Sequence, residues 1–169
     1  MRSFMGGGIA FMIKINLVTV GKVKEKYFSE AVAEYAKRLS RFCEFKLTEA
    51  EEINFVKTPN AAEIKKILSA EGENISKYIK GYIIVFAVEG KKLSSEGFAE
   101  KIKNLTDSGE GEITLVIGGS YGIDDKIKEK ANFKMSFSDM TFPHTMTRVI
   151  AAEQIYRAFT IIAGVGYHK

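Results

Sequence analysis

The 169-residue chain has very few of the residues that covalent or metal cross-links need. It contains one cysteine, Cys43, two histidines, His144 and His168, two prolines and no tryptophan. A single cysteine cannot form an internal disulfide, so we expect a protein of a reducing compartment, the cytoplasm. Zinc sites combine several cysteine and histidine ligands, so no metal site is expected. Cys43 lies among phenylalanines and is expected to pack rather than react.

Long apolar segments are also missing. A helix that crosses a bilayer needs about 20 apolar residues. The longest candidate, residues 146–165, is interrupted by three charged residues and a glutamine, so no membrane partner is expected. The first eleven residues, MRSFMGGGIAF, lack the apolar core and cleavage site of a signal peptide. We expect residues 1–11 to form a flexible leader and residues 12–169 to form a single domain.

Charge is nearly balanced along the chain. Lysine and arginine number 25, aspartate and glutamate number 21, and the formal net charge is +4. A composition of 46% hydrophobic and 27% charged residues is typical of a globular domain and argues against disorder. The mild positive charge is compatible with a nucleic-acid partner, but many other enzymes share it, so charge alone does not identify a partner.

Strand-like and helix-like patterns alternate along the sequence. Apolar and β-branched runs predict strands at residues 13–20, 44–49, 82–88, 113–117 and 133–137. Apolar residues at helical spacing predict helices at 27–39, 60–79, from 94 or 95, at 124–131, and from 144 to just before 164. This alternation predicts an α/β fold, with a mostly parallel sheet and helices on both faces.

Glycines follow the fourth predicted strand. Residues 113–117 run into Gly118-Gly119-Ser120-Tyr121-Gly122, where the backbone can approach a ligand closely because glycine has no side chain. The spacing matches neither the dinucleotide-binding fingerprint nor the phosphate-binding P-loop. The sequence therefore leaves two interpretations open, an unfamiliar nucleotide-binding loop and an ordinary tight turn.

Hydroxyl side chains follow the fifth predicted strand, in residues 136–144, which read SFSDMTFPH. Pro143 disfavours helix at Phe142, so the segment should stay extended until the last helix begins. The N-terminus of that helix offers free N–H groups to an anion, although a simple capped loop would have the same sequence. Because the carboxyl ends of parallel strands meet at one edge of a sheet, the two strand ends together favour a ligand pocket.

The sequence resembles the RlmH family in segments spread over residues 12–169. These segments are residues 15–22, 90–97, 116–120, 136–144, 148–149, 153–158 and the C-terminal Tyr167-His168-Lys169. Members of that family use S-adenosyl-L-methionine to methylate N3 of a pseudouridine in the 23S ribosomal RNA of the large subunit. The resemblance implies a SPOUT-type fold with a C-terminal trefoil knot, which pattern reading alone would reject because knots are rare. It also implies a homodimer with its active site near the subunit interface.

The resemblance further implies which residues contact the cofactor. These are Phe86, Gly118 and the run Ser136, Phe137, Ser138, Asp139, Met140 and Thr141. The family often has leucine where this chain has Phe86. A backbone or apolar contact would survive that change.

The C-terminal tripeptide and Arg148 are the expected catalytic or substrate-binding residues. His168 is the expected general base, because an unperturbed histidine pKa of about 6.5 suits proton transfer near neutrality. The alternative is that His168 only hydrogen-bonds the RNA or the terminal carboxylate. Tyr167 can stack on a base. Lys169 can contact a phosphate, and so can Arg148 from a neighbouring subunit.

RNA would have to be recognised by a shared surface, because the chain has no separate RNA-binding domain. The basic residues expected beside the strand ends are Lys22, Lys24, Lys26, Lys91 and Lys92. A net charge of +4 is modest, so we expect the substrate to be the assembled large subunit or ribosome rather than a short RNA. Two other functions fit the same pocket, a non-catalytic nucleotide- or RNA-binding module and a small-molecule methyltransferase.

Overall fold

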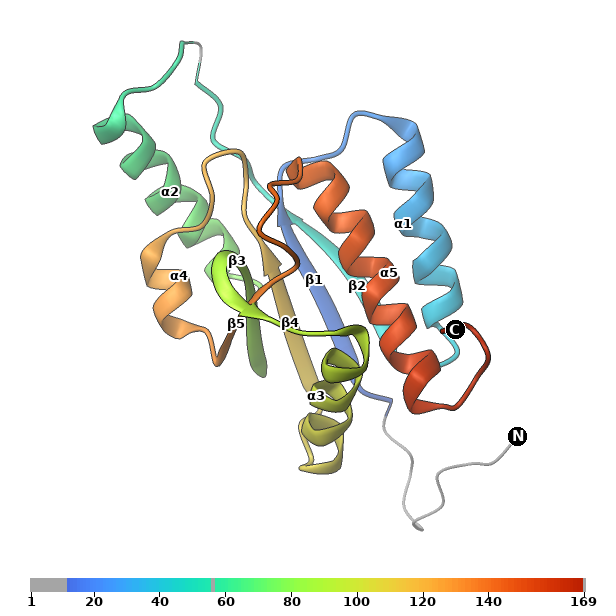
Figure 1. Ribbon diagram of the computed structural model, residues 1–169. Coiled ribbons are helices and arrows are strands. Elements are labelled where there is room, and N and C mark those ends of the chain that lie inside the picture. The colour runs from blue at the N-terminus through green and yellow to red at the C-terminus, as the bar shows by residue number, and fades with distance from the viewer. Residues whose placement is uncertain (1–11, 56, 169) are drawn as a thin grey trace.

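The computed structural model describes residues 12–55 and 57–168, and Figure 1 shows how their elements are arranged. The expected leader, residues 1–11, lies outside the described residues, as do Val56 and the expected RNA contact Lys169. Within the described part of the chain, no helix has the length and apolar character needed to cross a membrane.

Strands and helices alternate in the order that the sequence predicts. The strands are β1 (Lys14–Val20), β2 (Glu44–Ala50), β3 (Tyr82–Lys92), β4 (Glu112–Ile117) and β5 (Phe133–Ser136). The helices are α1 (Lys26–Leu39), α2 (Ala61–Ser76), α3 (Ser95–Asp107), α4 (Asp125–Lys130) and α5 (His144–Ile162). The largest difference from the prediction is in β3, which was expected to turn after Val88 but continues to Lys92.

The five strands form one sheet in the order β2-β1-β4-β3-β5. Every neighbouring pair is parallel, so the sheet is parallel throughout rather than mostly parallel as expected. All five carboxyl ends consequently lie at one edge of the sheet. In parallel α/β sheets this is the edge where ligands bind.

Helices cover both faces of the sheet (Figure 1). Leu17 and Leu115 belong to the apolar cluster that packs with α1, α3 and α5, whereas Val18 and Val116 belong to the cluster with α2 and α4. A strand covered on both faces is buried along its length, which explains why the central strand β4 reads as a nearly continuous apolar run. Cys43 lies in the first cluster, and burial raises the pKa of its thiol to about 12, as suits a packing residue.

Helix α2 begins with a capping box. The Asn60 side chain accepts a hydrogen bond from the Glu63 N–H at 3.0 Å, and the Glu63 carboxylate accepts one from the Asn60 N–H at 2.7 Å. Gly72 does not interrupt the helix. It allows α4 to approach instead, because a Cβ at Gly72 would lie 2.6 Å from an oxygen of Asp124, the residue that caps α4.

Candidate active site

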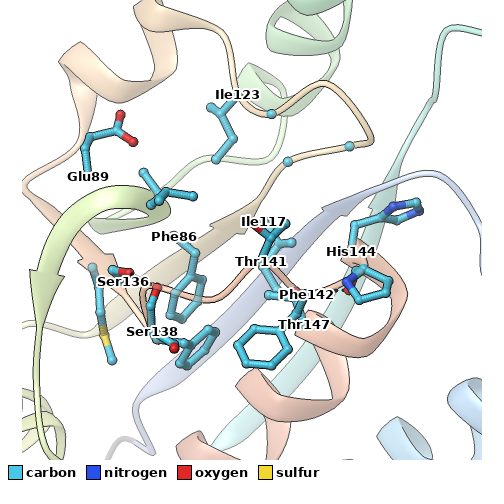
Figure 2. A pocket seen from close by; sticks show the side chains of 18 of the residues that line it. Phe86, Glu89, Ile117, Ile123, Ser136, Ser138, Thr141, Phe142, His144 and Thr147 are labelled. Carbon is cyan, nitrogen blue, oxygen red and sulfur yellow. Dashed lines mark hydrogen bonds between the residues drawn. The ribbon is translucent and has the colours of Figure 1, made fainter.

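A pocket of about 680 Å³ opens at the carboxyl edge of the sheet (Figure 2). Its walls come from the end of β3, from the glycine loop (residues 118–122), from the hydroxyl loop (residues 136–143) and from the first turn of α5. Its volume falls in the range of about 300–1,000 Å³ that is typical of small-molecule sites. The two strand ends singled out in the sequence therefore do form one pocket.

The glycine loop is a tight turn that also lines this pocket. The Gly122 N–H donates to the Gly119 carbonyl at 3.1 Å, and Gly122 has a φ of 99°, in the left-handed region that favours glycine. A Cβ at Gly118 would lie 2.1 Å from the Gly122 carbonyl oxygen. A side chain at Gly118 would therefore force the backbone of the loop apart.

The hydroxyl loop is held by its own hydrogen bonds. The Ser136 hydroxyl donates to the Ser138 carbonyl at 3.0 Å, and the Ser138 hydroxyl accepts from the Met140 N–H at 3.0 Å. The segment contains no helix until α5 begins at His144, as Pro143 predicts. Figure 2 shows Thr141, Phe142 and His144 at the pocket wall contributed by this loop and the start of α5.

A bulge in β3 forms a further wall. Met135 of β5 pairs first with Phe86 and again with Lys91, so residues 87–90 are extra in the ladder. Glu89 in this bulge pairs with Lys128 at 2.9 Å, and both line the pocket. The hydrogen bond from Lys128 is the main reason why the pKa of the Glu89 carboxyl lies below its usual value.

Comparison with known proteins identifies the family. Residues 13–168 match the family described as "Predicted SPOUT methyltransferase". A "Ribosomal RNA large subunit methyltransferase H" of Bifidobacterium adolescentis is 49% identical over 162 residues, which cover 93% of this chain and 100% of that protein. One of Leuconostoc mesenteroides is 45% identical over 159 residues, with the same coverage. The chain belongs to the RlmH family of SPOUT methyltransferases.

Solved structures support the SPOUT fold. A probable methylase family protein from Haemophilus influenzae superposes with a TM-score of 0.50 at 16% identity, covering 93% of this chain and 70% of that one. A probable methyltransferase from Bordetella pertussis also gives 0.50, at 12% identity, covering 88% and 95%. At such low identity, these likenesses bear on the fold alone.

Most of the expected cofactor residues of this SPOUT protein line the pocket. They are Phe86, Gly118, Ser136, Phe137, Ser138, Met140 and Thr141. The rings of Phe86 and Phe137 stack with their centroids 4.4 Å apart. Asp139 is the exception, because it does not line the pocket and its carboxylate forms an ion pair with Lys92.

Tyr167 and His168 lie elsewhere, in a network with α3 and the second half of α5. The His168 Nε2 is 2.7 Å from a carboxylate oxygen of Glu96, and its Nδ1 is 3.2 Å from the Arg157 guanidinium. The carboxylate only accepts and the guanidinium only donates, so these two contacts fit the tautomer that carries its proton on Nε2. Arg157 in turn donates to Glu153 at 2.9 Å, so this pair belongs to the network rather than to a solvated surface.

Tyr167 completes the same network. Its hydroxyl donates to Glu153 at 3.2 Å, and its ring packs edge-on against Tyr156 with centroids 4.8 Å apart. The Arg157 guanidinium lies 4.8 Å from the centre of the Tyr167 ring. Burial is the main cause that raises the pKa of Tyr167 to about 12, so its phenol keeps its proton at neutral pH.

One chain does not bring this network to the pocket. Thr147 lines the pocket, whereas Arg157 follows it by ten residues, which is about 15 Å along a helix axis. Neither Arg157, Tyr167 nor His168 is a lining residue. The cofactor residues and the C-terminal residues that the sequence predicts as one site are therefore separated within the described chain.

Arg148 is a buried cation in this chain. Its side chain is 1% exposed, and its guanidinium donates to the carbonyls of Val20 at 3.1 Å and Gly21 at 3.3 Å, and to Glu49 at 3.2 Å. Burial lowers the pKa of the guanidinium, and Glu49 and Glu52 oppose that effect. A direct phosphate contact, as expected from the sequence, would require these bonds to break.

Five of the lysines expected to contact RNA are exposed, namely Lys22, Lys24, Lys26, Lys91 and Lys92. Lys22 and Lys24 follow β1 at the carboxyl edge, and Lys91 ends β3 together with Lys92. Lys92 pairs with Asp139 across the hydroxyl loop, and Lys26 pairs with Glu30 on α1.

Several lining residues were missed by sequence reasoning. They are Ala87, Val88, Glu89, Ile123, Lys128 and Thr147, together with His144, which was expected only to cap or support a helix. A signal was present for the β3 residues, since they follow an apolar run whose carboxyl end must reach the same edge as β4. No local pattern indicates Lys128, which reaches the pocket from α4.

Proposed function

We propose that this protein uses S-adenosyl-L-methionine to methylate 23S ribosomal RNA of the large subunit, at N3 of a pseudouridine. The observation that carries the proposal is the open pocket between the glycine loop and the hydroxyl loop, in a chain that spans the full length of relatives named as ribosomal RNA large subunit methyltransferases. An assembled subunit or ribosome in the cytoplasm is the proposed substrate.

The residues of the pocket fit the cofactor. Its volume suits a nucleoside with an amino-acid tail, the glycine loop presents backbone rather than side chains, and Phe86 with Phe137 offers an apolar wall. Glu89 and Lys128 place a carboxylate and an ammonium group at the wall of the pocket, which suits a ligand that carries charges of both signs. When bound, the cofactor supplies a methyl group already activated by its sulfonium. The protein then contributes mainly position and electrostatics.

We propose that the working enzyme is a homodimer, in which the C-terminal residues of one subunit meet the pocket of the other. Within one chain, Arg157 on α5 and His168 beyond the end of α5 lie away from the pocket, so a complete site needs a second copy. Exposed apolar side chains at and beside the pocket support this, since Met140 is 74% exposed, and Phe142 and Met146 are also exposed. Contiguous exposed apolar groups are typical of interfaces.

In that arrangement we propose that His168 handles the proton of the target nitrogen. An imide nitrogen carries a proton at neutral pH and must lose it to accept a methyl group. The lone pair of His168 Nδ1 is the basic site, and Arg157 currently donates to it. Release of Nδ1 from Arg157 would free the base, while Glu96 would keep the ring oriented through Nε2. Lys169 and the exposed lysines near the strand ends would contact phosphates.

We also propose that the chain folds as one domain over residues 12–169, with a C-terminal trefoil knot. The proposal is supported by the SPOUT family match over residues 13–168 and by the adjacent positions of the glycine and hydroxyl loops around one pocket.

Mass mapping of ribosomal RNA tests the proposed activity. RNA from cells that lack the gene should miss one methyl group on a pseudouridine of 23S RNA, and the purified protein should restore it on intact large subunits or ribosomes. An unchanged modification pattern in the deleted strain would reject the assignment. Equal methylation of a short RNA hairpin would reject the ribosomal substrate alone.

Replacement of Gly118 by alanine should abolish cofactor binding. The added Cβ would lie 2.1 Å from the Gly122 carbonyl oxygen, a backbone atom that cannot move without opening the glycine loop. We expect calorimetry with S-adenosylhomocysteine to show an affinity at least about 100-fold lower, since strain of a few kcal/mol is involved. Gly111→Ala is the matched control, because a Cβ there meets no atom within 4 Å. Wild-type affinity in Gly118→Ala would mean that the loop does not shape the site.

A further inference from the structure

A buried carboxyl group lies directly behind the glycine loop. Glu71, from α2, is 4% exposed and does not line the pocket. One of its oxygens, Oε1, accepts from the Ile53 N–H at 3.2 Å. The other, Oε2, has no hydrogen-bond partner among the described residues, and a Cβ built on Gly119 would lie only 3.2 Å from it. Glu71 therefore supports Gly119 from the side that the pocket does not reach.

The surroundings of Glu71 do not suit a negative charge. Burial is the main cause that raises the pKa of this carboxyl, the nearby Glu52 raises it further, and the Ile53 N–H lowers it. Val20, which contacts the same side of Gly119, is uncharged. Asp124 packs against the same part of α2, beside Gly72, and it is also an acid. A buried charge without a partner is costly, so the protonated form fits this position better.

We propose that Glu71 is a positioning residue, which holds the glycine loop in its cofactor-binding shape as an uncharged carboxylic acid. Ionisation of Glu71 then weakens cofactor binding. The inference rests on the proposed function, because it takes the pocket to be the cofactor site. A charged Oε2 would need water as a hydrogen-bond partner. Gly119 lies too close to Oε2 to leave room for a water molecule, so α2 and the glycine loop would have to separate.

The direction of the pH dependence follows from the raised pKa. A carboxyl whose folded-state pKa is raised stabilises the folded loop at low pH, and this contribution is lost as pH rises through the folded value. Cofactor affinity should therefore fall as pH rises. The expected loss is up to about tenfold for each pH unit above the pH at which Glu71 loses its proton. The Gln side chain has nearly the shape of the protonated acid, so Glu71→Gln should remove this dependence.

Calorimetry with S-adenosylhomocysteine, from about pH 5.5 to about pH 9, tests the inference. Wild type should lose affinity as pH rises, whereas Glu71→Gln should keep the low-pH affinity throughout. Glu73→Gln is the matched control, since Glu73 is exposed on the same helix, and it should reproduce the wild-type profile. A Glu71→Gln profile that copies wild type would overturn the inference.

Carbon-13 NMR of the glutamate carboxyls in the wild-type protein provides a second test. One carboxyl, identified by its loss in Glu71→Gln, should titrate above the usual glutamate value of about 4.3. Saturation with S-adenosylhomocysteine should move that titration to higher pH, because the coupling between proton and ligand is reciprocal. An unmoved titration overturns the inference. Absence of binding at every pH would overturn the proposed function as well, whereas pH-independent binding would overturn only the role of Glu71.

Discussion

Two inactive variants of this protein should restore activity when they are expressed together. The first lacks residues 167–169 and keeps its pocket, and the second carries Gly118→Ala and keeps its C-terminal residues. Alone, each should fall at least about 100-fold in methylation, the scale of a lost acid–base group or a lost cofactor site. In the proposed homodimer, a mixed pair has one pocket and one C-terminus that are both intact and would face each other across the interface.

The arithmetic of mixing makes this prediction quantitative. Random pairing gives half mixed dimers, and each holds one complete site out of two, so about a quarter of wild-type activity should return. Expression of wild type with a doubly altered chain provides the control. Activity should drop to about a quarter if sites are shared between subunits, and to about half if each chain completes its own site. The second result would contradict the shared site.

Replacement of Arg148 by methionine should destabilise the protein strongly. The guanidinium is buried and ties the carbonyls of Val20 and Gly21 to Glu49. Removal of one partner from a buried charge pair typically costs about 3 kcal/mol or more. For a chain of this size such a loss lowers Tm by about 6–12 °C, measured by thermal unfolding at a fixed protein concentration.

This experiment also separates the two roles considered for Arg148. If Arg148 instead contacts a phosphate, Arg148→Met should leave stability unchanged and weaken RNA binding. The affinity for RNA should then also depend less on salt concentration. Arg41→Met is the matched control, because Arg41 is exposed and its guanidinium lies only over the ring of Phe42, 5.7 Å from its centre. Its loss should cost less than about 1 kcal/mol. An Arg148→Met protein as stable as this control would contradict the structural role.

The order and type of the elements could be predicted because they depend on local patterns. The capping box of Asn60 and Glu63 involves residues three positions apart, and β4 is one contiguous run of apolar and β-branched residues. The end of β3 was missed because it does not depend on a local pattern. Its bulge is set by the pairing of Met135 with both Phe86 and Lys91, which are far from Met135 in the sequence.

The candidate site was predicted in part. Parallel strands deliver their carboxyl ends to one edge, so the glycine loop and the hydroxyl loop were expected to meet, and they do. Asp139 shows the limit of this argument. It belongs to the right segment, but its carboxylate faces Lys92 rather than the pocket, and side-chain direction within a loop has no sequence period.

Residue patterns were enough to predict the alternation of strands and helices, the family resemblance and the two strand ends that form the pocket. The burial of Arg148, the position of Glu71 behind Gly119 and the contact of His168 with Glu96, 72 residues away, became visible in the folded chain. The reason is physical. Periodicity and capping act over a few residues, whereas the burial of a charge depends on which distant segments pack around it.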